Sequence, residues 1–192
     1  RRLLAPPRPG QSHWTRLRNL GFARGQAGVF HALLEFSRDT GAALPDWFSA
    51  ALDRLARRLT RPMAGASPWL RRSFCNGASG QVLLWAAAAR ATGAPAHARL
   101  AARAAQLASD RTRAGPTDVC CGLGGRAYAC LAMEQLEPGQ GWNGAAVELA
   151  TQAIERFESP WQHGLLRGWP GLVCLALDLT RPGPLGVPLV HA

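Results

Sequence analysis

Four copies of one glycine pattern constrain this chain more than any other feature of its sequence. Each copy reads X-Gly-x-x-Gly, and the first glycines, Gly25, Gly77, Gly122 and Gly168, lie 52, 45 and 46 residues apart. Repeats with a period of roughly 20–50 residues are typical of solenoids and rings, in which each unit buries its apolar face against the next. The pattern therefore predicts an architecture of stacked units.

An apolar segment of helical length follows each glycine turn. These segments are rich in Ala and Leu, which favours helices over strands: VFHALLEF, QVLLWAAAA, RAYACLAM and LVCLALDL. Thr40-Gly41-Ala42 and Thr92-Gly93-Ala94 end the first two segments, with glycine at the predicted C-cap. Glu137-Pro138-Gly139 and Pro182-Gly183 end the later two. Each unit thus begins with a turn and one apolar helix.

A second helix is expected after the stop in the first three units, over residues 45–59, 96–108 and 144–157. In the first of these segments, large apolar residues recur at helical spacing while arginines lie on the other side. The first helix of each unit is apolar almost all round, so we expect it to be buried on both sides. The pattern predicts an inner and an outer layer of helices.

The fold class predicted from this repeat is all-α, with the helical hairpins stacked as a ring or solenoid. We expect one domain over residues 1–192. The opening Arg-Arg-Leu-Leu, with no Met, suggests a piece of a longer protein. The repeat turns lie near residues 21–28, 73–80, 118–125 and 164–171. The segment 181–192 is rich in Pro and Gly and is not expected to be helical.

The charge of the chain excludes several classes of function. The net charge is +10, and all of the basic residues except five histidines are arginines, because the sequence has no lysine. This excludes a lysine Schiff base or lysine general base within these residues. The arginines form no dense run, so nucleic-acid binding is not expected. No apolar run reaches the roughly 18 residues of a membrane span, and we expect a cytoplasmic protein.

Three of the five cysteines occupy related positions in the repeat. Cys75 and Cys120 each directly precede the X of a turn, and Cys121 is itself the X. If the units stack in register, residues at equivalent positions meet at one end of the ring. Three thiolates at one point suit zinc, and a fourth position left open is typical of a catalytic site.

Two other interpretations of the cysteines remain open at this stage. Buried cysteines often act as small apolar side chains, and Cys130 and Cys174, which lie within apolar helices, fit that description. A vicinal redox pair at Cys120 and Cys121 is the main competitor of the metal site. The odd number of cysteines fits a reducing compartment better than a disulfide scaffold.

With these features together, the chain resembles the LanC-like family, the lanthionine synthetase C-like cyclase domain. The resemblance rests on GFARGQAG, SFCNGASG, DVCCGLGG with RAYACLAM, and GLLRGWPGLVCLALDL followed by GVPLV. These motifs occur in the family's order and cover the chain from Gly21 to Val190. The resemblance implies an α/α toroid, of which residues 1–192 would be one partial domain, roughly the C-terminal half of the ring. It also implies a zinc site at Cys75, Cys120 and Cys121.

The resemblance also implies an activity. In the family, zinc lowers the pKa of a cysteine thiol in a dehydrated precursor peptide, and the thiolate adds to dehydroalanine or dehydrobutyrine to give a thioether ring. The chain would then take part in lanthipeptide biosynthesis as a zinc-dependent peptide cyclase. A dehydratase or kinase-like domain on its N-terminal side is the implied partner.

The chain departs from the family pattern in its first turn. Arg24 stands where the family has a His proposed as acid/base, and arginine does not give up its proton at ordinary pH. Arg24 could still stabilise a developing enolate by charge. His163 is the other catalytic candidate. Arg167 and Asn76 are the candidates for substrate binding.

Arg24 keeps a second hypothesis open, in which the chain is a catalytically impaired zinc-containing module. Such a module would bind thiols or peptides and regulate a fused kinase-like domain. A third and more remote reading is another zinc-and-thiol toroid, such as a protein prenyltransferase subunit, whose turns match poorly. The intact set of three cysteines favours the cyclase.

Overall fold

The computed structural model describes residues 19–59, 68–110, 115–158 and 163–180. Within these ranges the chain forms eight α-helices and no strand. The prediction of an all-α fold is therefore confirmed. In chain order the helices are α1 (Gln26–Thr40), α2 (Phe48–Leu59), α3 (Pro68–Arg72), α4 (Ala78–Thr92), α5 (Pro95–Ala108), α6 (Leu123–Leu136), α7 (Trp142–Glu155) and α8 (Trp169–Thr180).

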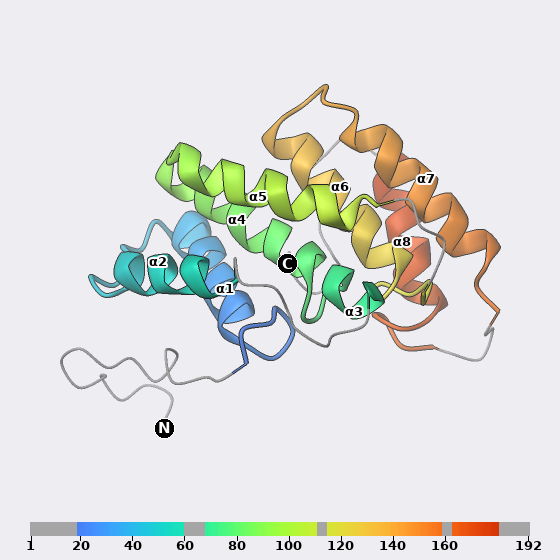
Figure 1. Ribbon diagram of the computed structural model, residues 1–192, viewed down its shortest axis with the longest axis horizontal. Coiled ribbons are helices and arrows are strands. Elements are labelled where there is room, and N and C mark those ends of the chain that lie inside the picture. Colours follow the sequence, from blue (N-terminus) through green and yellow to red (C-terminus); the bar gives the residue numbers. More distant parts are fainter. Residues whose placement is uncertain (1–18, 60–67, 111–114, 159–162, 181–192) are drawn as a thin grey trace.

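The helices form successive hairpins. In Figure 1 the pairs α1/α2, α4/α5 and α6/α7 follow one another from left to right, and α8 lies below α7. The helices that follow the glycine turns pack in sequence, α1 on α4, α4 on α6 and α6 on α8, and form the inner layer. The helices α2, α5 and α7 each pack on their own inner partner and form the outer layer. This arrangement is the predicted repeat of inner and outer helices.

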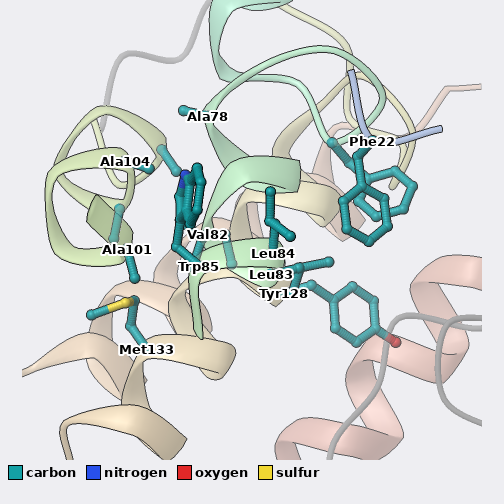
Figure 2. Close-up of a cluster of buried hydrophobic side chains, with 14 of the residues drawn as sticks. Phe22, Ala78, Val82, Leu83, Leu84, Trp85, Ala101, Ala104, Tyr128 and Met133 are labelled. Carbon is teal, nitrogen blue, oxygen red and sulfur yellow. The ribbon is translucent and has the colours of Figure 1, made fainter. Parts of the chain in front are cut away.

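The middle of the inner layer is the centre of the hydrophobic core. Helix α4 is buried on nearly every side, and Trp85 is 1% exposed. Figure 2 shows Trp85 between Val82 of its own helix and Ala101 and Ala104 of α5, with Met133 of α6 below it. The small alanines of α5 let the two helices approach while the indole fills the space between them. Truncating a side chain in such a position typically costs about 3–5 kcal/mol of unfolding free energy.

The Thr-Gly-Ala sequences end α1 and α4 in the same way. Gly41 and Gly93 adopt the left-handed conformation at the C-cap, with φ of 69° and 64°. The hydroxyls of Thr40 and Thr92 each donate to the carbonyl four residues earlier, at 2.6 and 2.7 Å, and accept from the N–H two residues later, at 3.2 Å. In the third hairpin, Glu134 accepts from two backbone N–H groups of the connection instead.

Several details differ from the prediction. The outer helix α2 begins at Phe48 and not at residue 45, because Pro45 lies in the turn that precedes it. The short helix α3 was not expected. Burial on both sides holds for α4 and α6 but not for the ends of the arc, since Phe36 on α1 and Val173 on α8 are exposed. The predicted non-helical segment 181–192, with Pro182-Gly183, lies outside the described residues.

Over the described ranges, none of the helices combines the length and the hydropathy that crossing a bilayer requires.

Candidate metal centre

The four glycine turns lie side by side and are joined by their backbones. The N–H of Ala23 donates to the carbonyl of Cys75 at 3.0 Å, that of Cys75 to Cys120 at 3.1 Å, and that of Cys120 to Leu166 at 2.8 Å. All four residues hold the same place, directly before the X of their turn. Equivalent positions of the repeat are therefore neighbours in space, as the sequence pattern predicted.

The second glycine of each turn is required by a close backbone approach. A Cβ at Gly28, Gly80, Gly125 or Gly171 would collide with the carbonyl oxygen six residues earlier in the chain. The turn folds back onto the start of its own inner helix, and only glycine leaves room for that carbonyl. The spacing of the motif thus fixes where the inner helix begins and, with it, where the residue before the X lies.

This backbone brings three sulfur atoms together. The Sγ atom of Cys121 lies 3.6 Å from that of Cys75 and 3.6 Å from that of Cys120. All three sulfur atoms lie within 4.8 Å of one another, and all three cysteines are partly buried and free of disulfides. The convergence of these thiols, which the sequence placed 45 and 46 residues apart, is the main geometric result.

Polar groups of neighbouring residues lie close to the thiols. The Oγ atom of Ser73 lies 3.5 Å from Cys75 Sγ, and the Nδ2 atom of Asn76 donates to the same sulfur at 3.5 Å. The carboxylate of Asp118 accepts from the backbone N–H of Cys121 at 2.7 Å and so fixes that residue within its turn. Ser73 and Asp118 were missed from the sequence. The Asp118-x-x-Cys121 spacing, typical of a carboxylate that closes a turn onto a nearby N–H, could have indicated the second of them.

Without a metal, the three cysteine thiols differ in pKa. Hydrogen bonding with Cys120, and then with Ser73 and Cys121, lowers the pKa of Cys75 to about 5 against the opposing effect of burial. The pKa of Cys120 is raised, because its proton is held by the Cys75 sulfur. Burial raises the pKa of Cys121. One sulfur of the cluster therefore carries a negative charge at neutral pH while the other two keep their protons.

The donor set and its dimensions fit zinc. Zinc binds thiolates at about 2.3 Å in tetrahedral geometry, which places two bound sulfurs about 3.8 Å apart. Two of the observed separations are 3.6 Å, and the third is at most 4.8 Å. Small rotations of the side chains would therefore be enough for all three sulfurs to bind one ion. Three protein ligands leave the fourth position of the tetrahedron for another group.

The remaining candidates lie at different distances from the thiols. Asn76 contacts Cys75 directly. Arg167 is exposed, and the Cys120 sulfur raises the pKa of its guanidinium. Arg24 and His163 are exposed and form no hydrogen bond with another of the described residues. The structure thus brings Arg167 and Asn76 to the cluster. It shows no hydrogen bond from Arg24 or His163 to the cluster within the part of the chain that it describes.

The other two cysteines lie away from the cluster, on the inner helices. Cys130 of α6 is fully buried, as expected for a small apolar side chain, whereas Cys174 of α8 is only partly buried. Near them the Tyr128 hydroxyl donates to the Asp178 carboxylate at 2.9 Å and joins α6 to α8. Figure 2 shows the Tyr128 side chain directed toward α8.

Comparison with known proteins gives a family match and similar solved structures. The family described as lanthionine synthetase C-like protein matches residues 6–190. A search of curated proteins finds no relative. Among solved structures, the chain is similar to a nisin cyclase with a TM-score of 0.61 and 17% sequence identity, over 84% of this chain and 46% of that one. The likeness shows that the folds agree, and the chain spans less than half the length of the nisin cyclase.

Proposed function

Because this chain belongs to the lanthionine synthetase C-like family, we propose that it carries the zinc site of a peptide cyclase that forms thioether rings. The single observation that supports this most is the convergence of three sulfurs within 4.8 Å at the turns of the inner helices. The substrate would be a dehydrated precursor peptide that contains a cysteine. The product would be a lanthionine-type ring.

Cys75, Cys120 and Cys121 would hold the zinc. When bound, zinc supplies a thiolate nucleophile, because it lowers the pKa of a coordinated peptide thiol so that the thiol ionises at neutral pH. Asn76 holds the Cys75 sulfur and Asp118 holds the backbone of Cys121, so these residues orient the cluster. Asn76 is only partly buried beside Cys75, and we propose that it also contacts the peptide.

In this proposal, exposed side chains of the turns stabilise the negative charge of the enolate and deliver the proton. Arg24, exposed in the first turn, would stabilise the enolate that develops when a thiolate adds to a dehydro residue. Arg24 does not release a proton, so His163, also exposed, is the group proposed to deliver one. Arg167 lies in the fourth turn, where an acidic group of the peptide would meet it.

The second candidate function is a binding module without turnover, and Arg24 is the observation that favours it. A residue that cannot exchange a proton stands where the family's acid/base group is expected. Such a module would hold zinc and bind thiols or peptides, and it could regulate a kinase-like or dehydratase domain elsewhere in a longer protein. The thiol cluster is common to both candidates.

One experiment separates the two candidates. The zinc-loaded chain is incubated with a synthetic peptide that contains one dehydroalanine and one cysteine, beside a Cys121→Ala variant as control. Ring closure leaves the mass unchanged, so it is measured as the loss of free thiol by alkylation and mass spectrometry. Cyclisation above the control supports the enzyme. Bound zinc with no cyclisation in the wild type or in Arg24→His would leave the binding module.

A further inference from the structure

Ser73 is a fully buried serine beside the sulfur cluster. It is 0% exposed, so its hydroxyl forms its hydrogen bonds within the protein. The hydroxyl donates to the Leu70 carbonyl at 2.8 Å and accepts from the backbone N–H of Asn76 at 3.3 Å. It also accepts from the Cys75 thiol, with 3.5 Å between Oγ and Sγ. This hydroxyl therefore links the backbone of the second turn to one sulfur of the cluster.

The position of Ser73 in the repeat distinguishes the central turns from the flanking ones. Four residues before the first glycine, the second and third turns have Ser73 and Asp118, whereas the first and fourth have Gly21 and Gly164. Ser73 and Asp118 each accept the backbone N–H of the residue three positions later, at 3.3 and 2.7 Å. Of these two, only the serine has a hydrogen that it can give to a sulfur, because a carboxylate only accepts.

Metal binding would change the contact between Ser73 and Cys75. A hydroxyl has one hydrogen. In the structure that hydrogen lies on the Leu70 carbonyl, and the thiol supplies the hydrogen between Sγ and Oγ. A sulfur that binds a metal carries no proton. The sulfur and the hydroxyl oxygen would then be neighbours with no hydrogen between them, unless the serine supplied its own.

The backbone of the second turn allows the hydroxyl hydrogen to turn toward the sulfur. The Leu70 carbonyl also accepts the backbone N–H of Ser73, at 3.2 Å. When the hydroxyl turns away, this carbonyl keeps a hydrogen bond and is not left unsatisfied. The N–H of Asn76 keeps the serine oxygen as its acceptor. A hydrogen bond to a charged sulfur is also stronger than one to a neutral carbonyl.

We propose that Ser73 is a positioning residue of the metal centre, whose hydroxyl accepts from the Cys75 thiol in the free protein and donates to the Cys75 sulfur when that sulfur binds the metal. The inference rests on the proposed function, because it requires that the three cysteines hold zinc. Hydrogen bonds of this kind orient metal ligands and tune the charge that they donate, and losing one typically costs 10–100-fold in metal affinity.

The test is zinc affinity, measured on the full chain by competition with a chromophoric chelator. Ser79 provides a matched control, because it lies in the same turn, is also 0% exposed and donates its hydroxyl to the Arg72 carbonyl at 2.5 Å. Within the described residues it forms no hydrogen bond with a sulfur. We expect Ser73→Ala to bind zinc about tenfold more weakly than the wild type. Ser79→Ala should match the wild type, and Ser73→Thr, which keeps the hydroxyl, should recover most of the loss.

A fourth variant guards against a failure to fold. Ser73→Gly introduces the residue that both flanking turns have at this position, so the repeat accommodates it. It should bind zinc as weakly as Ser73→Ala. Thermal unfolding without metal checks that all the variants are folded.

A second readout responds to the sulfur itself. With cobalt in place of zinc, the sulfur-to-metal charge-transfer absorption should move to lower energy in Ser73→Ala and Ser73→Gly, because a sulfur without its hydrogen bond gives up charge more readily. The band should stay in place in Ser79→Ala. Wild-type affinity and absorption in both Ser73→Ala and Ser73→Gly would overturn the inference and leave the zinc site standing. So would equal weakening in the two alanine variants without a shift of the band. A wild-type chain that binds no metal would overturn the proposed function as well.

Discussion

The two central turns and the two flanking turns have the same backbone conformation but present different side chains. All four have the same glycines, the same start of an inner helix and the same hydrogen bonds between neighbours. The central turns present Cys75, Cys120 and Cys121, whereas the flanking turns present Arg24 and Arg167. The glycines therefore determine where each inner helix begins. The two residues before the first glycine determine what the turn can bind.

The same contrast is seen in the helices behind the turns. The central helices α4 and α6 are enclosed by neighbours on both sides, whereas α1 and α8 end the arc and expose apolar side chains such as Phe36 and Val173. The three cysteines thus lie in the turns that lead into these two enclosed helices. Rigid support of this kind is what a metal site requires, because its ligands must stay within a fraction of an ångström of their positions.

The largest expected effect is the loss of metal from the central turns. Cys121→Ala removes the sulfur that lies 3.6 Å from both of the others, so zinc binding should fall by more than about 100-fold. Cys174→Ala, which alters a partly buried cysteine of α8, should leave zinc binding unchanged. Zinc content after dialysis against a weak chelator measures both. Equal zinc in the two variants would show that the central turns are not the site.

The next largest effect is expected from the close approach of backbone groups that is common to all four turns. Gly125→Ala places a methyl group against the Val119 carbonyl, so we expect the free energy of unfolding to fall by about 2–4 kcal/mol. Gly144→Ala, in α7 where nothing lies near the added carbon, should raise it by about 0.5 kcal/mol. Urea unfolding followed by circular dichroism gives both values. Tolerance of alanine at Gly125 would remove the close approach as the reason for the motif.

Acidification should weaken zinc binding at the central turns with a defined slope. The pKa of Cys75 is lowered to about 5, whereas those of Cys120 and Cys121 are raised, so near pH 7 two protons leave when zinc binds. The logarithm of the affinity should rise by about two per pH unit at neutral pH, and by about three below pH 5. Titration calorimetry in buffers of different ionisation enthalpy counts the protons. A release of three at pH 7 would contradict the shared proton between Cys75 and Cys120.

The smallest effect is expected from a flanking turn. Arg24→His removes the permanent positive charge that is proposed to stabilise the enolate, so cyclisation of a dehydroalanine peptide should slow about tenfold. Zinc content should not change, because Arg24 forms no hydrogen bond with the described part of the cluster. A faster reaction in Arg24→His would instead support the view that the chain lacks an acid/base group at this position.

Much of the fold could be predicted from the sequence because it is repetitive. The glycine spacing and the Thr-Gly stops predicted the inner and outer helices and the meeting of the three cysteines. What could not be predicted depends on single contacts. The hydrogen bond from the Cys120 N–H to the Leu166 carbonyl follows from how the third and fourth turns stack, and Glu134 replaces a Thr-Gly stop that the third hairpin lacks. Exposure at the ends of the arc depends on neighbours that the repeat does not specify.

The central claim is that Cys75, Cys120 and Cys121 hold one zinc ion together. X-ray absorption at the zinc edge, on the chain loaded with one equivalent of zinc, tests it most directly. We expect three sulfur neighbours at about 2.3 Å and a single nitrogen or oxygen neighbour in the fourth position. A shell with one sulfur or none, or zinc that washes out of the wild type as easily as out of Cys121→Ala, would contradict it.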